Sequence, residues 1–66
     1  MSVAKVIEIL AEGETLEKAT EAALEGASKS VKNIRNIYVE DYQAIVENSK
    51  ISKYRINAKI TFVVED

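Results

Sequence analysis

The sequence predicts an α+β fold in which a three-stranded antiparallel sheet packs against one helix, in the order strand, helix, strand, strand. Three observations carry this prediction. Residues 53–64 alternate almost without interruption between apolar and polar side chains, which is the period of a half-buried strand. Residues 3–10 are apolar on both faces, and in residues 35–46 Ile37, Val39 and Ile45 alternate with polar residues, so both segments are also predicted strands. Between these two segments, apolar residues recur at the three- and four-residue spacing of an amphipathic helix.

The length and composition favour one domain, residues 1–66, that associates with other chains. A chain of this size buries only about 60% of the surface that its unfolded form exposes, so small domains usually need disulfides, a metal or partner chains. Cysteine and histidine are both absent, which excludes disulfides and the usual zinc or iron sites. Oligomerisation is therefore the expected source of additional stability.

The charge pattern gives no sign of a nucleic-acid or membrane partner. The formal net charge is −2 with both signs mixed, so no strong field would attract a polyanion or an anionic lipid surface. Charged residues interrupt the apolar N-terminal segment, which therefore does not resemble a signal peptide, and no apolar run has transmembrane length. We expect a soluble, cytoplasmic protein.

The first predicted strand, residues 3–10, carries apolar residues on both of its faces: Val3, Val6, Ile7, Ile9 and Leu10. A strand of this kind is covered on both sides. One helix can cover only one face of a small sheet, so we expect another subunit to cover part of the other face.

The predicted helix follows a turn at Gly13 and begins after Thr15, which is a favourable N-cap residue. Asn33 is expected to end it, because asparagine adopts the left-handed conformation common at helix ends. Gly26 lies within the helix at a cost of about 1 kcal/mol relative to alanine, which predicts a close contact there. The apolar stripe comprises Leu16, Ala19, Ala23, Ala27, Val31 and Ile34.

The second and third strands are expected to form a hairpin, because residues 47–50 are a turn cluster of Glu, Asn, Ser and Lys. The alternation of residues 35–46 slips around Asp41 and Gln43, which predicts a bulge. The last strand is long and contains neither glycine nor proline, so we place it at the centre of the sheet. Its apolar face comprises Tyr54, Ile56, Ala58, Ile60, Phe62 and Val64.

With this order of elements, the chain resembles the dodecin family along essentially its whole length. The matching stretches are residues 5–9, the helix exit at residues 31–35, and the last strand from Tyr54-Arg55-Ile56 to Phe62. Dodecins are small strand-helix-strand-strand proteins that assemble as hollow dodecamers and, in the best-known branch, store flavins. The resemblance implies a homododecamer that binds and stores a small molecule or ion and is not an enzyme.

Two departures from the flavin-storing branch bear on the ligand. A tryptophan that stacks on the flavin ring matches Asn36 here, and a glutamine that hydrogen-bonds the ring edge matches Arg55. Asparagine offers no aromatic platform, and arginine cannot accept hydrogen bonds. Binding of FMN or riboflavin is therefore expected to be weak or lost. The Tyr-Arg-Ile run is similar to a branch without the tryptophan that is associated with calcium.

The candidate ligand-binding residues are Asn36, Tyr38, Arg55 and Asn57, which the alternation places on the sheet face away from the helix. They fit two alternatives. One is a ligand cleft between symmetry-related subunits. The other is a polar interface in a purely structural assembly, because buried polar groups commonly satisfy one another.

A calcium site is a further alternative, for which the sequence does not identify the ligands. Calcium takes six to eight oxygen ligands, and no segment has the spacing of an EF-hand loop. A symmetry axis could nevertheless gather copies of one carboxylate. The carboxylates considered are Glu8, Glu40, Asp41, Glu47, Glu65 and Asp66.

Catalysis is poorly supported by the sequence. Without histidine or cysteine, a general base would have to be a carboxylate, a lysine or a tyrosine, and no spacing suggests a perturbed pair. The serines have no visible activating partner. We expect no enzymatic activity and no catalytic residues.

Overall fold

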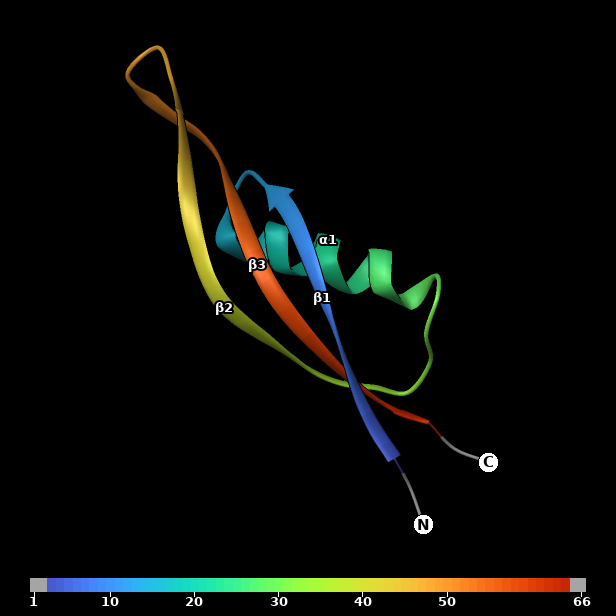
Figure 1. Ribbon diagram of the computed structural model, residues 1–66. Coiled ribbons are helices and arrows are strands. Elements are labelled where there is room, and N and C mark those ends of the chain that lie inside the picture. The colour runs from blue at the N-terminus through green and yellow to red at the C-terminus, as the bar shows by residue number, and fades with distance from the viewer. Residues whose placement is uncertain (1–2, 65–66) are drawn as a thin grey trace.

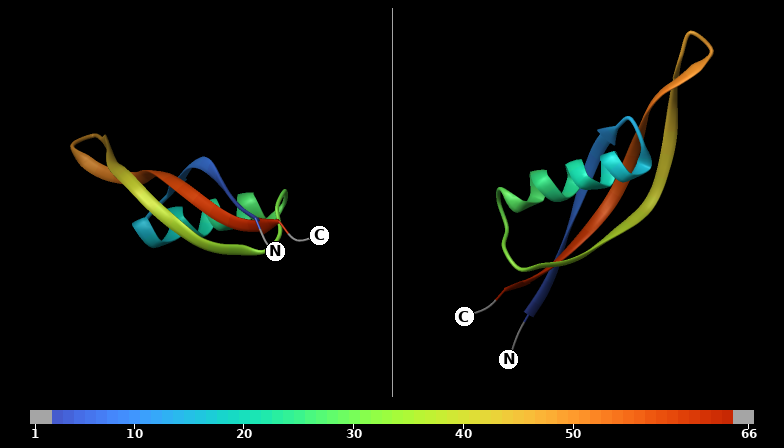
Figure 2. Two further views of the ribbon diagram at one scale, coloured as in Figure 1. Left: turned by 60° about the horizontal axis from the view of Figure 1, so that its bottom comes forward. Right: turned by 180° about the vertical axis from the view of Figure 1, so that it is seen from behind.

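The computed structural model describes residues 3–64 and has the predicted α+β order of elements. The elements are β1 (Val3–Gly13), α1 (Leu16–Ser28), β2 (Ile34–Glu47) and β3 (Lys50–Val64). The strands form one antiparallel sheet in the order β1-β3-β2, so the last strand is central, as predicted. The helix crosses one face of this sheet obliquely and leaves the opposite face uncovered (Figure 1, Figure 2).

The core lies between α1 and the central strand. The apolar face of β3 is buried at Ile56, Ala58 and Ile60, which confirms its predicted orientation. The helix contributes only alanines to the fully buried set, so its axis can lie close to the sheet. These alanines are Ala19, Ala23 and Ala27.

The helix begins as predicted but ends earlier. The Lys18 backbone N–H donates to Thr15 Oγ1 at 3.0 Å, so Thr15 is the N-cap. The helix ends at Ser28 rather than at Asn33, which corrects the sequence prediction. Asn33 does have a positive φ of 60°, but its carbonyl accepts the Val63 N–H at 3.1 Å. This bond ties Asn33 to β3, so the chain has already left the helix to reach the sheet.

Neither glycine has the role that the sequence predicted. Gly26, for which a close contact was predicted, has open space where a Cβ would lie. At Gly13, a Cβ would lie 2.7 Å from the carbonyl carbon of Lys18 and closer still to the backbone nitrogen of Ala19. Gly13 is also the last residue of β1 rather than part of a separate turn. The close approach between strand and helix therefore requires glycine at position 13.

The hairpin and its irregularity agree with the sequence. β2 pairs with β3, and the register shifts between Val39 and Asp41, close to the predicted slip. Asn48 and Ser49 form the tip with φ angles of 52° and 63°. Two consecutive positive φ angles are typical of a tight hairpin turn whose twist matches that of the strands.

The subunit is elongated and leaves much of its apolar surface exposed. Its extents are 52 × 19 × 13 Å, and its radius of gyration is 13.6 Å. A compact chain of this length would have a radius of about 11 Å. On the face of β1 away from the helix, Val6 is 56% and Leu10 is 71% exposed. The second apolar face of this strand therefore has no cover within the chain.

Candidate functional site

The sheet face opposite α1, which we call the polar sheet face, carries the candidate site. Because Ile56, Ala58 and Ile60 point to the helix, the residues between them point to the opposite side. The register then brings charged and polar residues of all three strands to this face. They are Glu8 and Glu12 of β1, Asn36, Tyr38 and Glu40 of β2, and Lys53, Arg55, Asn57 and Lys59 of β3.

The four predicted ligand-binding residues all lie on the polar sheet face, but they do not converge. Asn36 pairs with Thr61 of β3, whereas Arg55 pairs with Gln43 of β2. Thr61 and Arg55 are about six strand residues apart, so Asn36 and Arg55 are separated by roughly 20 Å. A small ligand could therefore contact both positions only where Asn36 of one chain lies near Arg55 of another.

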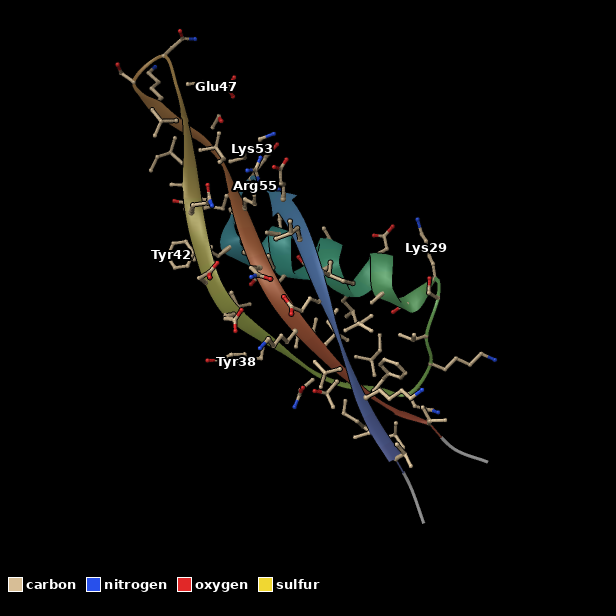
Figure 3. All side chains as sticks on the ribbon, in the orientation of Figure 1. Lys29, Tyr38, Tyr42, Glu47, Lys53 and Arg55 are labelled. Carbon is tan, nitrogen blue, oxygen red and sulfur yellow. The ribbon has the colours of Figure 1, made fainter. Side chains whose placement is uncertain are left out.

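Arg55 is bound to a carboxylate of the same chain. Arg55 Nη2 and Nε each lie 2.7 Å from Glu12 Oε2, and Lys53 Nζ lies 2.9 Å from Glu12 Oε1. Figure 3 shows Lys53 and Arg55 next to each other on β3, beside the end of β1. The hydrogen bonds from Lys53, and then those from Arg55, hold the pKa of Glu12 below its ordinary value.

A second carboxylate, Glu40, binds the other part of this face. Lys59 Nζ lies 3.1 Å from Glu40 Oε1, and Asn57 Nδ2 donates to Glu40 Oε2 at 3.3 Å. The hydrogen bond from Lys59 to Glu40 raises the pKa of that ammonium group. Glu40 lies at the β2 register shift between Val39 and Asp41.

The two carboxylates change the chemistry available to the predicted site. Arg55 and Asn57 already have anionic partners in their own chain, so a ligand that used them would have to compete with Glu12 and Glu40. Asn36 is exposed, and Tyr38 is 62% exposed and projects from β2 (Figure 3). These two residues present an amide and a phenol to whatever covers this face.

The sequence did not identify Glu12 as a partner of Arg55. The stretch around Gly13 was interpreted as a turn, which would take Glu12 off the sheet. The signal that could have placed it is the alternation Val6, Glu8, Leu10 and Glu12, which continues the strand by two residues. Position 12 then lies opposite position 55 in the register.

The part of the chain that the structure describes contains no ready-made pocket or metal site. Among residues 3–64 there is no group of three or more acidic side chains close enough to hold an ion. Glu65 and Asp66, which were considered as calcium ligands, lie outside the described residues. Residues 3–64 by themselves form no pocket. A binding site on the polar sheet face would therefore need a second chain to enclose it.

Comparison with known proteins identifies both a family and a fold. The sequence model of the family described as Dodecin matches residues 3–65. No curated protein sequence gives a significant match. Within the described residues, no helix is both long enough and apolar enough to cross a lipid bilayer.

Several solved structures share the fold at low sequence identity. A Thermus thermophilus dodecin mutant, with an arginine replaced by alanine, has a TM-score of 0.92 and 24% identity, with full coverage of both chains. The dodecin of Streptomyces davaonensis has a TM-score of 0.91 and 17% identity over 98% of this chain and 97% of that one. The Streptomyces coelicolor dodecin gives 0.90 and 17%, over 98% and 94%.

Proposed function

Because the chain belongs to the dodecin family, we propose that it is a non-enzymatic, homododecameric, cytoplasmic storage protein that holds a small molecule between the polar sheet faces of neighbouring subunits. Dodecins are known as small flavin-binding proteins that assemble as homododecamers. Asn36, Tyr38, Arg55 and Asn57 are the proposed ligand-binding residues.

The observation that carries this proposal is the uncovered polar sheet face. All four residues lie on it, and no element within residues 3–64 covers it. Asn36 and Arg55 are too far apart for one small ligand to reach both within a subunit. A site shared by two or more subunits satisfies both facts.

The flavin affinity of this chain is proposed to be weak or absent. By the family resemblance, Asn36 stands where a tryptophan would stack on the ring. Tyr38 lies on the same face and is exposed, but it is two residues further along β2. Arg55, in place of the glutamine, is bound by Glu12 at 2.7 Å. The ring therefore loses both its stacking platform and its hydrogen-bonding partner.

A purely structural assembly is the second candidate, and the same ion pairs favour it. Glu12 and Glu40 satisfy Arg55, Lys53 and Lys59 within one chain. A face on which most charges are already paired can be buried against another subunit with a smaller desolvation cost than one with free charges. In this case, the four residues would contact other subunits and bind nothing.

The test restores the flavin chemistry. In the double variant Asn36→Trp with Arg55→Gln, riboflavin fluorescence should be quenched on titration, whereas the unsubstituted chain should quench it weakly or not at all. Ser28→Trp, with the new tryptophan on the exposed side of α1, is the matched control and should behave like the unsubstituted chain. Native mass spectrometry checks that each variant remains a dodecamer.

The outcomes separate the candidates. If the double variant is dodecameric but does not bind riboflavin, the hypothesis of a ligand cleft between subunits is contradicted. The purely structural assembly then remains. Native mass spectrometry of the purified unsubstituted dodecamer could also show excess mass that is lost on activation. The size of this mass would identify the natural ligand. Thermal stabilisation by calcium chloride but not by magnesium chloride would instead indicate an ion site at a symmetry axis, because the two ions differ in size and coordination.

A further inference from the structure

The end of the β2–β3 hairpin extends beyond the rest of the sheet. The last β1 residue, Gly13, pairs with Tyr54, so residues 45–53 form a two-stranded ribbon with no third strand. We call these residues the hairpin arm. Figures 1 and 2 show the arm projecting past the start of α1. A two-stranded ribbon without further cover is only marginally stable in water.

The hairpin arm nevertheless carries apolar side chains in the open. Val46 and Ile51 are opposite each other across the hairpin and are 61% and 57% exposed. At the base of the arm, Tyr42 is 58% exposed, and its ring centroid lies 6.3 Å from that of Tyr54. Single exposed apolar residues are ordinary, but a contiguous group on a projecting element is typical of an interaction surface.

The amount of exposed surface fits a second copy of the chain as the occupant. The subunit exposes 4957 Å². A compact protein of its mass would expose roughly 4,200 Å², so the excess is roughly 750 Å². This excess belongs to the whole subunit, in which exposed apolar residues of β1 contribute beside those of the arm. It is close to the ~800 Å² that one partner contributes to a standard protein–protein interface. The tip residues Glu47 and Lys50 are of opposite charge, and Lys53 is paired with Glu12 of β1 at 2.9 Å. The arm therefore has no charge bias against an identical chain.

We propose that a second copy of this chain packs against the hairpin arm, with Val46 and Ile51 buried at that contact. This contact adjoins the polar sheet face at Lys53 but is made by other residues, Val46 and Ile51. The inference rests on the proposed homododecamer. The arm is therefore ordered by assembly, and one subunit supports the hairpin of its neighbour.

The absence of cysteine from the sequence allows a direct test. Ile51→Cys places the only thiol of the chain on the arm, and Ser28→Cys places it on the exposed side of α1. Under native conditions, a maleimide should modify Ile51→Cys roughly tenfold or more slowly than Ser28→Cys, because burial protects the thiol. Both should react at the same rate in denaturant. Val46→Cys repeats the test on the facing strand.

A disruptive pair of variants adds an independent readout. Ile51→Lys should shift native mass spectra to smaller assemblies, whereas Ser28→Lys, with the same change in net charge, should remain dodecameric. Equal labelling rates at positions 51 and 28 in an intact dodecamer would overturn the arm interface and leave the proposed function standing. A monomeric mass for the unsubstituted chain would overturn both.

Discussion

Glu12 makes the stability of this protein depend on pH at the scale of a single residue. Lys53 and Arg55 bind the ionised carboxylate, which holds the pKa of Glu12 below its ordinary 4.5. The unfolded chain lacks these contacts. Ionised Glu12 therefore favours the folded state above its ordinary pKa, and this contribution is lost as the pH falls through the lowered pKa of the folded form. Because its side chain is 36% exposed, the effect should weaken in salt.

Glu12→Gln should remove this pH dependence. We expect the melting temperature of the unsubstituted protein to fall more steeply below pH 4.5 than that of the variant, with the difference reduced in high salt. Melting curves recorded between neutral and acid pH, in low and in high salt, measure the decrease in melting temperature and its dependence on salt. The control is Glu14→Gln, which removes only the exposed ion pair to Lys18 at 3.6 Å. Identical acid profiles for the unsubstituted protein and Glu12→Gln would refute the role assigned to Glu12.

The two glycines give a second prediction at the residue scale. Gly13→Ala should lower the free energy of unfolding by about 1–3 kcal/mol, because the new Cβ overlaps backbone atoms that cannot move without shifting the helix. Gly26→Ala should raise it by up to about 1 kcal/mol, because alanine is the better helix former and the site is open. Urea unfolding at one fixed protein concentration measures both. Destabilisation by Gly26→Ala would contradict the open site.

Among the elements, the helix is held to the sheet by small side chains. Ala19, Ala23 and Ala27 are the fully buried residues of α1, and they lie over Ile56, Ala58 and Ile60 of β3. The close approach that requires glycine at position 13 lies at the start of the same helix, where Lys18 and Ala19 meet the end of β1. The separation between α1 and β3 is therefore set by alanine and cannot be widened locally without losing contacts elsewhere.

Ala23→Leu tests this separation. The larger side chain has no space against β3, so we expect the free energy of unfolding to fall by about 1–3 kcal/mol. Ala22→Leu adds the same atoms to the same helix at an exposed position and should change stability by less than about 0.5 kcal/mol. Chemical unfolding of both variants gives the comparison. Equal effects would mean that the helix is free to move away from the sheet.

The local periodicity of the sequence predicted which helices and strands form. Tertiary contacts determine where these elements end. The alternation of residues 53–64 identified a central strand, and the slip near Asp41 identified the bulge. The end of the helix was misplaced because Val31 continues the apolar stripe, although it packs against the core from a loop. Asn33 has the expected left-handed backbone but is bound to Val63. Sequence spacing alone does not contain that long-range bond.

For the whole molecule, the sequence predicted that the four candidate residues lie on the sheet face opposite the helix, as they do. It did not reveal their hydrogen-bonding and ionic partners within the chain. The two-residue period was enough to put Asn36, Tyr38, Arg55 and Asn57 opposite the helix. The strand register places Glu12 beside Arg55. The register and the bulge together place Glu40 beside Lys59 and Asn57. These are set by pairing between strands that are distant in the sequence, so spacing within one strand could not identify them.

The elongated shape and small core of the subunit predict that folding and assembly are coupled. Ile56 and Ile60 are the only large side chains fully buried among residues 3–64, so we do not expect an isolated subunit to remain folded. If dissociation and unfolding coincide in a dodecamer, each tenfold increase in protein concentration should add about 1.3 kcal/mol per subunit to the apparent stability.

At a urea dependence of about 1 kcal/mol per molar, a tenfold increase in protein concentration should raise the unfolding midpoint by roughly 1 M. Circular dichroism after full equilibration, approached from both the folded and the unfolded side, measures the midpoint, and sedimentation velocity at the same urea concentrations measures assembly. The two transitions should coincide and move together with concentration. A midpoint independent of concentration, with a folded monomer in the sedimentation profile, would show that one chain is stable alone. The exposed residues of β1 and of the hairpin arm would then need another explanation, since the argument for a partner rests on a subunit that cannot bury enough of its own apolar surface.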